Sequence, residues 1–148
     1  MSSNIDSNID FQALVTGAGD GIMASDAQGL ITLWNPACER MFGFTQADAL
    51  GKSLDLIIPQ RQQKPHWDGY HKTMETGITK YGNDVLRVPA VHKDGRTLSI
   101  AFTVSMLHNP DGSVSAIVAV IRDESVKFAQ ERALKKRINE LEIELAAK

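Results

Sequence analysis

Hydrophobic and polar residues alternate most clearly between residues 96 and 107. Side chains on a β-strand point alternately to its two faces, so every second residue shares a face. The intervening residues are Thr, Ser and Ala, which predicts a strand with one buried and one more polar face. The residues on the predicted buried face are Leu98, Ile100, Phe102, Val104 and Met106.

The segment 113–122 is apolar without alternation, because Ala116 to Ile121 form six consecutive apolar residues. A strand that is apolar on both faces is usually covered on both. One face, with Ile117, Ala119 and Ile121, is expected to join the inner core. The other face then needs a second cover, either a short N-terminal helix, expected from Ile9 to a stop at Gly17, or a partner chain.

Turn residues predict three further strands. The turn at residues 26–29 separates predicted strands 21–25 and 30–34, and the Lys93-Asp94-Gly95 turn joins predicted strand 84–91 to strand 96–107. Gly, Asn and Asp favour such turns. The connection after Trp34 is predicted to hold three short helical segments, 37–42, 46–50 and 53–59. Asn35 with Pro36 and then Thr45 are the helix-start signals of the first two.

A fourth helix is predicted from Pro65 to Gly77, after a polar loop at residues 60–64. Proline suits a first helical turn, and glycine suits the left-handed residue that ends a helix. His66, Tyr70 and Met74 lie four residues apart and therefore share one helix face. A helix with this stripe toward a sheet can form one wall of a pocket.

The chain changes character at residue 123, after which charged residues dominate and neither Gly nor Pro occurs. This predicts three regions: a frayed tail at 1–10, a domain at 11–122 and an amphipathic helix at 123–148. The apolar residues of this helix recur at steps of four, three and four, which is the spacing of a coiled-coil seam. We expect a homodimer, parallel or antiparallel, through Leu134, Ile138, Leu141 and Leu145.

Composition narrows the class of protein. The net charge is −2 and there is no long basic run, so nucleic-acid binding by this chain is not expected. No signal peptide and no membrane-spanning apolar run occur, so we expect a cytoplasmic protein that does not bind membranes. A single cysteine, Cys38, excludes an internal disulfide. His66 and His71 are five apart, which is not the spacing of a helical metal pair, and no catalytic residues are predicted.

The order of elements and several motifs resemble a PAS domain of the bacterial sensor type. The motifs are Asp20-Gly21-Ile22, the 26–31 hairpin, Trp34-Asn35-Pro36-Ala37, Phe42-Gly43-Phe44 with Ala49-Leu50-Gly51-Lys52, the strand and turn of 87–95, and Arg122-Asp123-Glu124-Ser125. The resemblance implies an α+β fold: a five-stranded antiparallel sheet with short helices on one face and a C-terminal helix. It also implies sensing within kinases, cyclases, transcription factors or chemoreceptors, without catalysis by this domain.

The resemblance implies a pocket between the fourth helix and the sheet. The cofactor is unknown, and a small apolar or amphipathic ligand is expected if the pocket is open. The flavin-photosensing branch is not favoured, because the segment Leu54 to Ile57 has no thiol. The expected lining is His66, Tyr70, Met74, Tyr81, Leu86, Ile100, Phe102, Val104, Ile117, Ala119 and Ile121.

Three functions remain open at this stage. The first is a dimeric sensory module that passes a signal to an effector domain or partner protein through Asp123, Glu124 and Ser125. The second is a haem-based gas or redox sensor, because alignment with haem-binding oxygen sensors places His66 at the iron-ligating position. That alignment also places Leu86 where those sensors carry an Arg, and Arg87 would face away. The third is a dimerisation scaffold whose pocket is filled by its own side chains.

Overall fold

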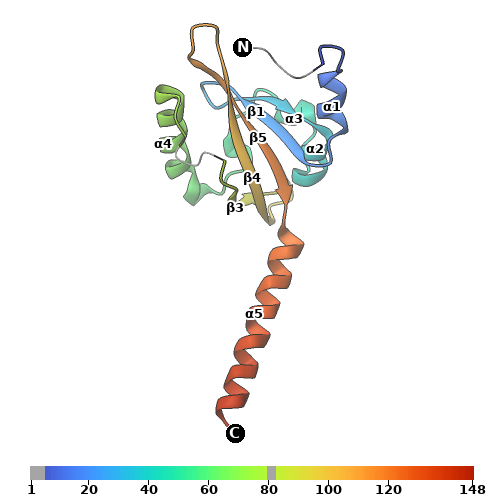
Figure 1. The fold of residues 1–148 in the computed structure, drawn as a ribbon, viewed down its shortest axis with the longest axis vertical. Helices are drawn as coiled ribbons and strands as arrows, with labels where there is room; N and C mark the ends of the chain where they lie inside the picture. Colours follow the sequence, from blue (N-terminus) through green and yellow to red (C-terminus); the bar gives the residue numbers. More distant parts are fainter. Residues whose placement is uncertain (1–5, 80–82) are drawn as a thin grey trace.

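The computed structural model describes residues 6–79 and 83–148. These residues form a five-stranded antiparallel sheet, which confirms the predicted α+β class (Figure 1). The strands lie in the order β2-β1-β5-β4-β3, so the last strand occupies the centre of the sheet. Their bounds are Gly21–Ser25 for β1, Ile31–Trp34 for β2, Leu86–Val91 for β3, Thr97–His108 for β4 and Val114–Asp123 for β5.

Most helices occupy the predicted segments. Their bounds are Phe11–Gly17 for α1, Pro36–Phe42 for α2, Gln46–Ala49 for α3, Leu54–Leu56 for the 3₁₀ turn η1, Gln60–Thr76 for α4 and Ser125–Ala146 for α5. The cap residues explain the sharp starts. The Asn35 side chain accepts a hydrogen bond from the Cys38 N–H at 3.1 Å, and Gly43 ends α2 in the left-handed conformation.

The start of α4 corrects the prediction. The helix begins at Gln60 rather than Pro65, so the expected polar loop at 60–64 is helical. Gln, Arg and Lys are good helix formers, and the first four N–H groups of a helix have no intrahelical partner in any case. Pro65 is the sixth residue of α4, so the helix lacks the hydrogen bond that an N–H at this position would donate to the carbonyl of residue 61.

The hydrophobic core lies between the helices and one face of the sheet. The strand register places Phe102 opposite Ile121 and Val104 opposite Ala119, so these residues share the inner face. Trp34, Phe42 and Ile31 are among its most buried side chains. Cys38 is also fully buried there, and burial raises the pKa of its thiol to about 12, as expected of a packing residue.

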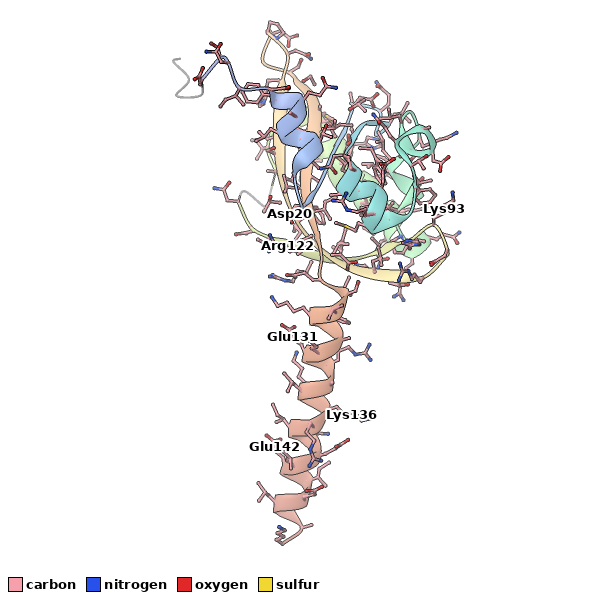
Figure 2. The ribbon with its side chains drawn as sticks, turned by 90° about the vertical axis from the view of Figure 1, so that its right-hand side faces the viewer. Asp20, Lys93, Arg122, Glu131, Lys136 and Glu142 are labelled. Carbon is pink, nitrogen blue, oxygen red and sulfur yellow. The ribbon has the colours of Figure 1, made fainter. Side chains whose placement is uncertain are left out.

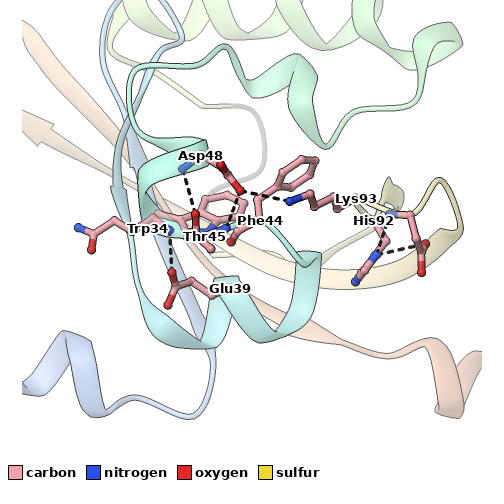
Figure 3. Close-up of polar contacts among 9 residues, drawn as sticks. Trp34, Glu39, Phe44, Thr45, Asp48, His92 and Lys93 are labelled. Atoms are coloured by element: carbon pink, nitrogen blue, oxygen red, sulfur yellow. Dashed lines mark hydrogen bonds and ion pairs between the residues drawn. The ribbon is translucent and has the colours of Figure 1, made fainter.

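The α2–α3 connection is fastened to the turn between β3 and β4. Thr45 and Asp48 form a reciprocal capping box at the start of α3, and Asp48 also pairs with Lys93 at 3.4 Å (Figure 3). The Lys93 N–H donates to the Phe42 carbonyl at 2.9 Å. The neighbouring His92 packs on Gly43, where an added Cβ would come within 2.6 Å of its ring.

The outer face of the sheet is only partly covered in the single chain. Helix α1 lies beside α2, where the Asn35 amide donates to the Val15 carbonyl at 3.0 Å (Figure 1). On the outer face Val120 is 40% exposed, and Leu14 of α1 is 61% exposed. The N-terminal helix therefore does not give the central strand the second cover that its apolar sequence indicates.

Candidate functional site

Helix α4 is fastened to the sheet through Tyr70, its one fully buried residue. The Tyr70 hydroxyl lies 2.8 Å from the Ser25 hydroxyl at the end of β1 and also hydrogen-bonds the Asp26 carbonyl. Burial raises the pKa of Tyr70, so the phenol stays protonated and can donate. The middle residue of the inner stripe predicted for this helix thus makes polar contacts with the end of β1.

Trp67 holds the same helix against the β1–β2 turn and η1. Its indole N–H donates to the Asp55 carboxylate at 2.7 Å. Its ring packs so closely on Gly29 that an added Cβ would lie 2.1 Å from it. Gly29 also has a φ of +80°, which favours glycine. A substitution at Gly29 would therefore displace Trp67 and with it the middle of α4.

His66 is half-buried beside these two aromatic residues. Its ring packs edge-on against Trp67 with centroids 4.7 Å apart, and the Tyr70 ring lies 5.7 Å away. Its Nδ1 atom is buried, and so is the Gln62 Oε1 atom one helical turn earlier; among the described residues neither has a hydrogen-bond partner. Burial lowers the pKa of His66, partly offset by the Asp55 carboxylate, so the imidazole is neutral at pH 7.

A neutral imidazole with a free buried nitrogen has the chemistry of a haem-iron ligand. His66 fits that requirement in its charge state. The rest of the predicted pocket offers no positive charge for a haem propionate, because Leu86 shares the inner face with Phe102 while Arg87 lies on the opposite side of β3. Of the predicted pocket residues, only His66 thus has chemistry that suits haem.

The structure brings most of the predicted pocket residues together. Tyr70, Ile100 and Ile121 are part of the buried core, and Met74, Phe102, Ile117 and Ala119 pack against it. Leu86 and Val104 are half-buried on the same sheet face. Tyr81 lies outside the described residues. A role for this set in ligand binding stays a prediction.

Two open cavities occur elsewhere on the surface. One, of about 570 Å³, lies between the start of α4 and the β3–β4 edge, and is lined by Pro59, Gln60, Arg61, Gln62, Pro89 and Thr97. The other, of about 300 Å³, lies beside α2 at the end of β5, and is lined by Gly19, Asp20, Ala37, Arg40, Met41, Arg122 and Asp123. Within the described residues, neither lining includes a residue of the predicted pocket.

The predicted signal junction is hydrogen-bonded to β4. The Glu124 N–H donates to the Ser99 carbonyl at 2.8 Å, and the Ser99 N–H donates to the Ser125 hydroxyl at 3.0 Å. The Ser125 N–H in turn donates to the Asp123 carboxylate at 2.9 Å. The start of α5 is therefore hydrogen-bonded to the first residues of β4.

Charged groups add a second link at the same place. The Glu124 carboxylate pairs with Arg87 of β3 at 3.2 Å and with Lys127 of α5 at 3.6 Å, and its side chain is only 18% exposed. Arg122 at the end of β5 makes two 3.2 Å hydrogen bonds to the Asp20 carboxylate, which raise the pKa of the guanidinium (Figure 2). The junction is thus paired with β3, and the end of β5 that leads into it is paired with the segment before β1.

Beyond the junction, α5 projects away from the domain (Figure 1). It has no buried residue, and its four seam residues are 41% to 69% exposed. Among the described residues no helix is long and apolar enough to span a membrane.

Several contact residues escaped the sequence analysis. The sequence predicts a loop at Gln62, and Ser25 and Asp55 show no signal beyond strand and helix propensity. Arg87 was assigned only to the outer face of its strand, and its pairing with Glu124 spans 37 residues. Such long-range polar pairs leave no periodicity in the sequence, so only the folded chain identifies them.

Comparison with known proteins agrees with the fold. The profile of the family described as PAS fold matches residues 9–123. The signal transduction histidine-protein kinase AtoS of Escherichia coli is 25% identical over 82% of this chain, and the oxygen sensor protein DosP of the same organism is 25% identical over 73%. The matches span 19% and 13% of those proteins, so this chain covers less than a fifth of either.

A solved structure shows the same fold. The PAS domain of a protein from Colwellia psychrerythraea superposes with a TM-score of 0.67 and 19% identity, covering 78% of this chain and 93% of that one. At this identity the likeness concerns the fold alone.

Proposed function

The chain belongs to the PAS-fold family, a family of sensory domains typical of signal-transduction proteins, and from this premise we propose that it is a dimeric cytoplasmic sensor that transmits its signal through α5. The observation that carries the proposal is the junction. Strand β5 lies at the centre of the sheet and continues into α5 through Glu124, which is tied to both β3 and β4. A shift of the sheet therefore reaches the first turn of the helix.

The proposed signal starts at α4. Its buried anchor, Tyr70, bonds to the end of β1, and β1 pairs with β5 along its whole length. A small apolar or amphipathic ligand between α4 and the inner sheet face would displace α4 and change the strain on β1 and β5. Because β5 pairs with β1 and continues into α5, the change would reach Glu124 and the helix.

The proposed output is mechanical, with no catalysis by this chain. The α5 pair would pass the change to an effector domain or a partner protein. AtoS is a histidine-protein kinase, and we include a kinase among the proposed effectors on the strength of that relationship.

The test compares the full chain with a chain that ends at Val126. Sedimentation velocity measures the oligomeric state of both, and hydrogen exchange of the junction measures the response to ligand. We expect the full chain to be a dimer and the shortened chain a monomer. An unchanged oligomeric state, with an unchanged junction response, would refute the proposed role of α5.

The second candidate function is haem-based sensing through His66. It is favoured by the buried, unpartnered Nδ1 of this neutral imidazole, and the similarity to the oxygen sensor protein DosP supports testing it. Haem bound there would supply a gas-binding iron, and His66 would be its protein ligand. Protein purified from cells fed a haem precursor should then show a Soret band that His66→Ala removes, with His71→Ala as the control.

A featureless spectrum would reject the haem candidate. Native mass spectrometry of the same sample then separates the remaining two functions. An apolar molecule that co-purifies supports the ligand sensor, whereas a dimer that carries no ligand and ignores added ligands supports the scaffold.

A further inference from the structure

The apolar seam of α5 is exposed in the single chain. Leu134, Ile138, Leu141 and Leu145 are 63%, 55%, 41% and 69% exposed. Figure 1 shows that the helix extends away from the sheet, so no other described element covers the seam. A helix with one apolar stripe is stabilised mainly by packing that stripe against another surface. The occupant must therefore come from outside this chain.

The charges that flank the seam are segregated along the helix. Lys135, Lys136 and Arg137 precede the midpoint of the seam, which lies between residues 139 and 140, whereas Glu140, Glu142 and Glu144 follow it. A second copy of α5 carries the same two blocks. If it runs antiparallel, each basic block lies beside an acidic block, and the charges attract. If it runs parallel, the blocks of like sign lie side by side.

The heptad positions make this difference specific. Leu134 and Leu141 are d positions, and Ile138 and Leu145 are a positions, because the steps are four, three and four. An antiparallel pair centred between residues 139 and 140 packs Ile138 on Leu141 of the second copy and Leu134 on Leu145. The seam then closes without a polar residue in its four central layers.

The same register pairs the flanking charges. At the e positions Lys135 faces Glu142 of the second copy, and at the g positions Arg137 faces Glu144. Beyond the apolar layers, Glu131 faces Lys148. Each pair occurs twice by symmetry, and every one joins opposite charges.

A parallel pair is less favourable. It keeps one attraction, between Arg137 and Glu142 of the second copy, because parallel coiled coils place g beside the following e position. It also sets Glu131 opposite Glu131 at an a position and Lys127 opposite Lys127 at a d position. Like charges that face each other across a seam are destabilising.

We infer that α5 pairs antiparallel with α5 of a second copy, so that the two PAS domains lie at opposite ends of the paired helices. The inference rests on the homodimer of the proposed function and specifies the direction of its helices. It also means that each Glu124 junction is far from its symmetry mate, so the two junctions report separately.

Charge reversal distinguishes the two directions. In the antiparallel pair K135E places two Glu side chains together, and E142K places two Lys together; each change should weaken the dimer about tenfold, since two pairs are inverted per dimer. The double variant K135E/E142K exchanges the charges and should restore dimerisation. In a parallel pair Lys135 faces the uncharged Gln130, so K135E should have little effect. The double variant should then dimerise weakly, because its new Lys at position 142 lies beside Arg137 of the second copy.

The matched control is K136E, which makes the same change in net charge at an f position. Figure 2 shows Lys136 on the other side of α5 from Glu131 and Glu142. Dimer dissociation constants come from sedimentation equilibrium of the full chain, and circular dichroism checks that helix content is equal. Weakening by K136E equal to that by K135E would overturn the inference, because it would show an effect of net charge alone.

Disulfide formation provides an independent measurement. In an antiparallel pair residue 134 lies beside residue 145 of the other copy and about 16 Å along the axis from its own mate, too far for a disulfide. A mixture of L134C and L145C should therefore cross-link, whereas L134C alone should not. Buried Cys38 does not compete.

The outcomes separate the two proposals. Cross-linking of L134C with itself, with a stable dimer, overturns the antiparallel direction and leaves the dimeric sensor intact. A parent chain that stays monomeric at high concentration overturns both.

Discussion

At the scale of single residues, α4 depends on two polar contacts with distant parts of the chain. The Tyr70 hydroxyl bonds near the end of β1, and the Trp67 indole bonds to Asp55 of η1. Beside them, His66 contributes a buried nitrogen that has no hydrogen-bond partner among the described residues. Unpartnered buried polar atoms are costly, so this point of the helix is where a ligand group could gain binding energy.

We predict that Tyr70→Phe lowers the free energy of unfolding by about 1–2 kcal/mol. The change removes a buried hydroxyl and leaves the Ser25 hydroxyl and the Asp26 carbonyl with one partner fewer. Urea unfolding at pH 7 measures the loss. Ser25→Ala is the matched control, with a smaller expected effect because Tyr70 keeps its bond to Asp26. Equal stability of Tyr70→Phe and the parent would contradict the anchoring role.

His66 predicts a pH dependence. Its pKa in the folded chain lies below the ordinary value of 6.5, so the unfolded state binds more protons as the pH falls. The contribution of His66 to stability is therefore present above pH 6.5 and is lost as the pH falls through the folded-state pKa. Urea titrations at pH 7.5 and 5.5 should show a larger drop for the parent than for His66→Gln. An equal drop in the parent and in His66→Gln would contradict this prediction.

At the scale of elements, the junction joins three strands to one helix. The Ser99 carbonyl of β4 accepts from the Glu124 N–H, and the Ser99 N–H donates to the Ser125 hydroxyl. These two bonds fix the position at which α5 begins. The start of α5 has no side-chain cap of its own. Hydrogen bonds to β4 therefore position the start of α5, whereas a side-chain cap marks the start of α2.

We predict that Arg87 and Glu124 are energetically coupled by about 0.5 kcal/mol, the size expected of an ion pair whose arginine is exposed to solvent. A double-mutant cycle with Arg87→Ala and Glu124→Gln measures this coupling. Hydrogen exchange of the first turn of α5 should also become faster in each single variant. Arg96→Ala removes an arginine that pairs with Asp94 in the β3–β4 turn and should leave that exchange unchanged. Independent effects of Arg87 and Glu124 would disprove the link.

At the scale of the whole molecule, the domain and the helix are separate in their packing. The core cluster is formed by the sheet and the helices before β3, and α5 contributes no buried side chain. Folding of the domain and pairing of the helix are therefore expected to be distinct events, although one junction connects them.

A chain that ends at Val126 should consequently remain folded. It keeps Ser125, and with it the partner of the Ser99 N–H. We expect a cooperative thermal transition with a midpoint that no longer depends on protein concentration, because dimerisation no longer stabilises the fold. The full chain should show that dependence. Loss of cooperative unfolding in the shortened chain would show that α5 is part of the domain.

Most of the architecture was predictable, because strands and caps leave local signals. The turns at Gly29 and Gly95 and the caps at Asn35 and Thr45 fall where the sequence places them. The start of α4 was not predictable, since a proline at residue 65 is compatible with two helix positions. In the added turn, the Gln63 amide donates to the Ile58 carbonyl at 3.1 Å, a tertiary contact that local pattern does not indicate.

The sequence by itself predicted the five strands and the apolar seam of α5, because both follow from periodicity and turn residues over short stretches, and its resemblance to PAS domains predicted the α+β fold. Only the tertiary structure decided the partners of Tyr70, Trp67 and Glu124. Those contacts join residues 12 to 45 positions apart, and polar pairs at that distance depend on strand register and helix placement rather than on local pattern. The same reason explains why the unpartnered nitrogen of His66 is visible only once the chain has folded.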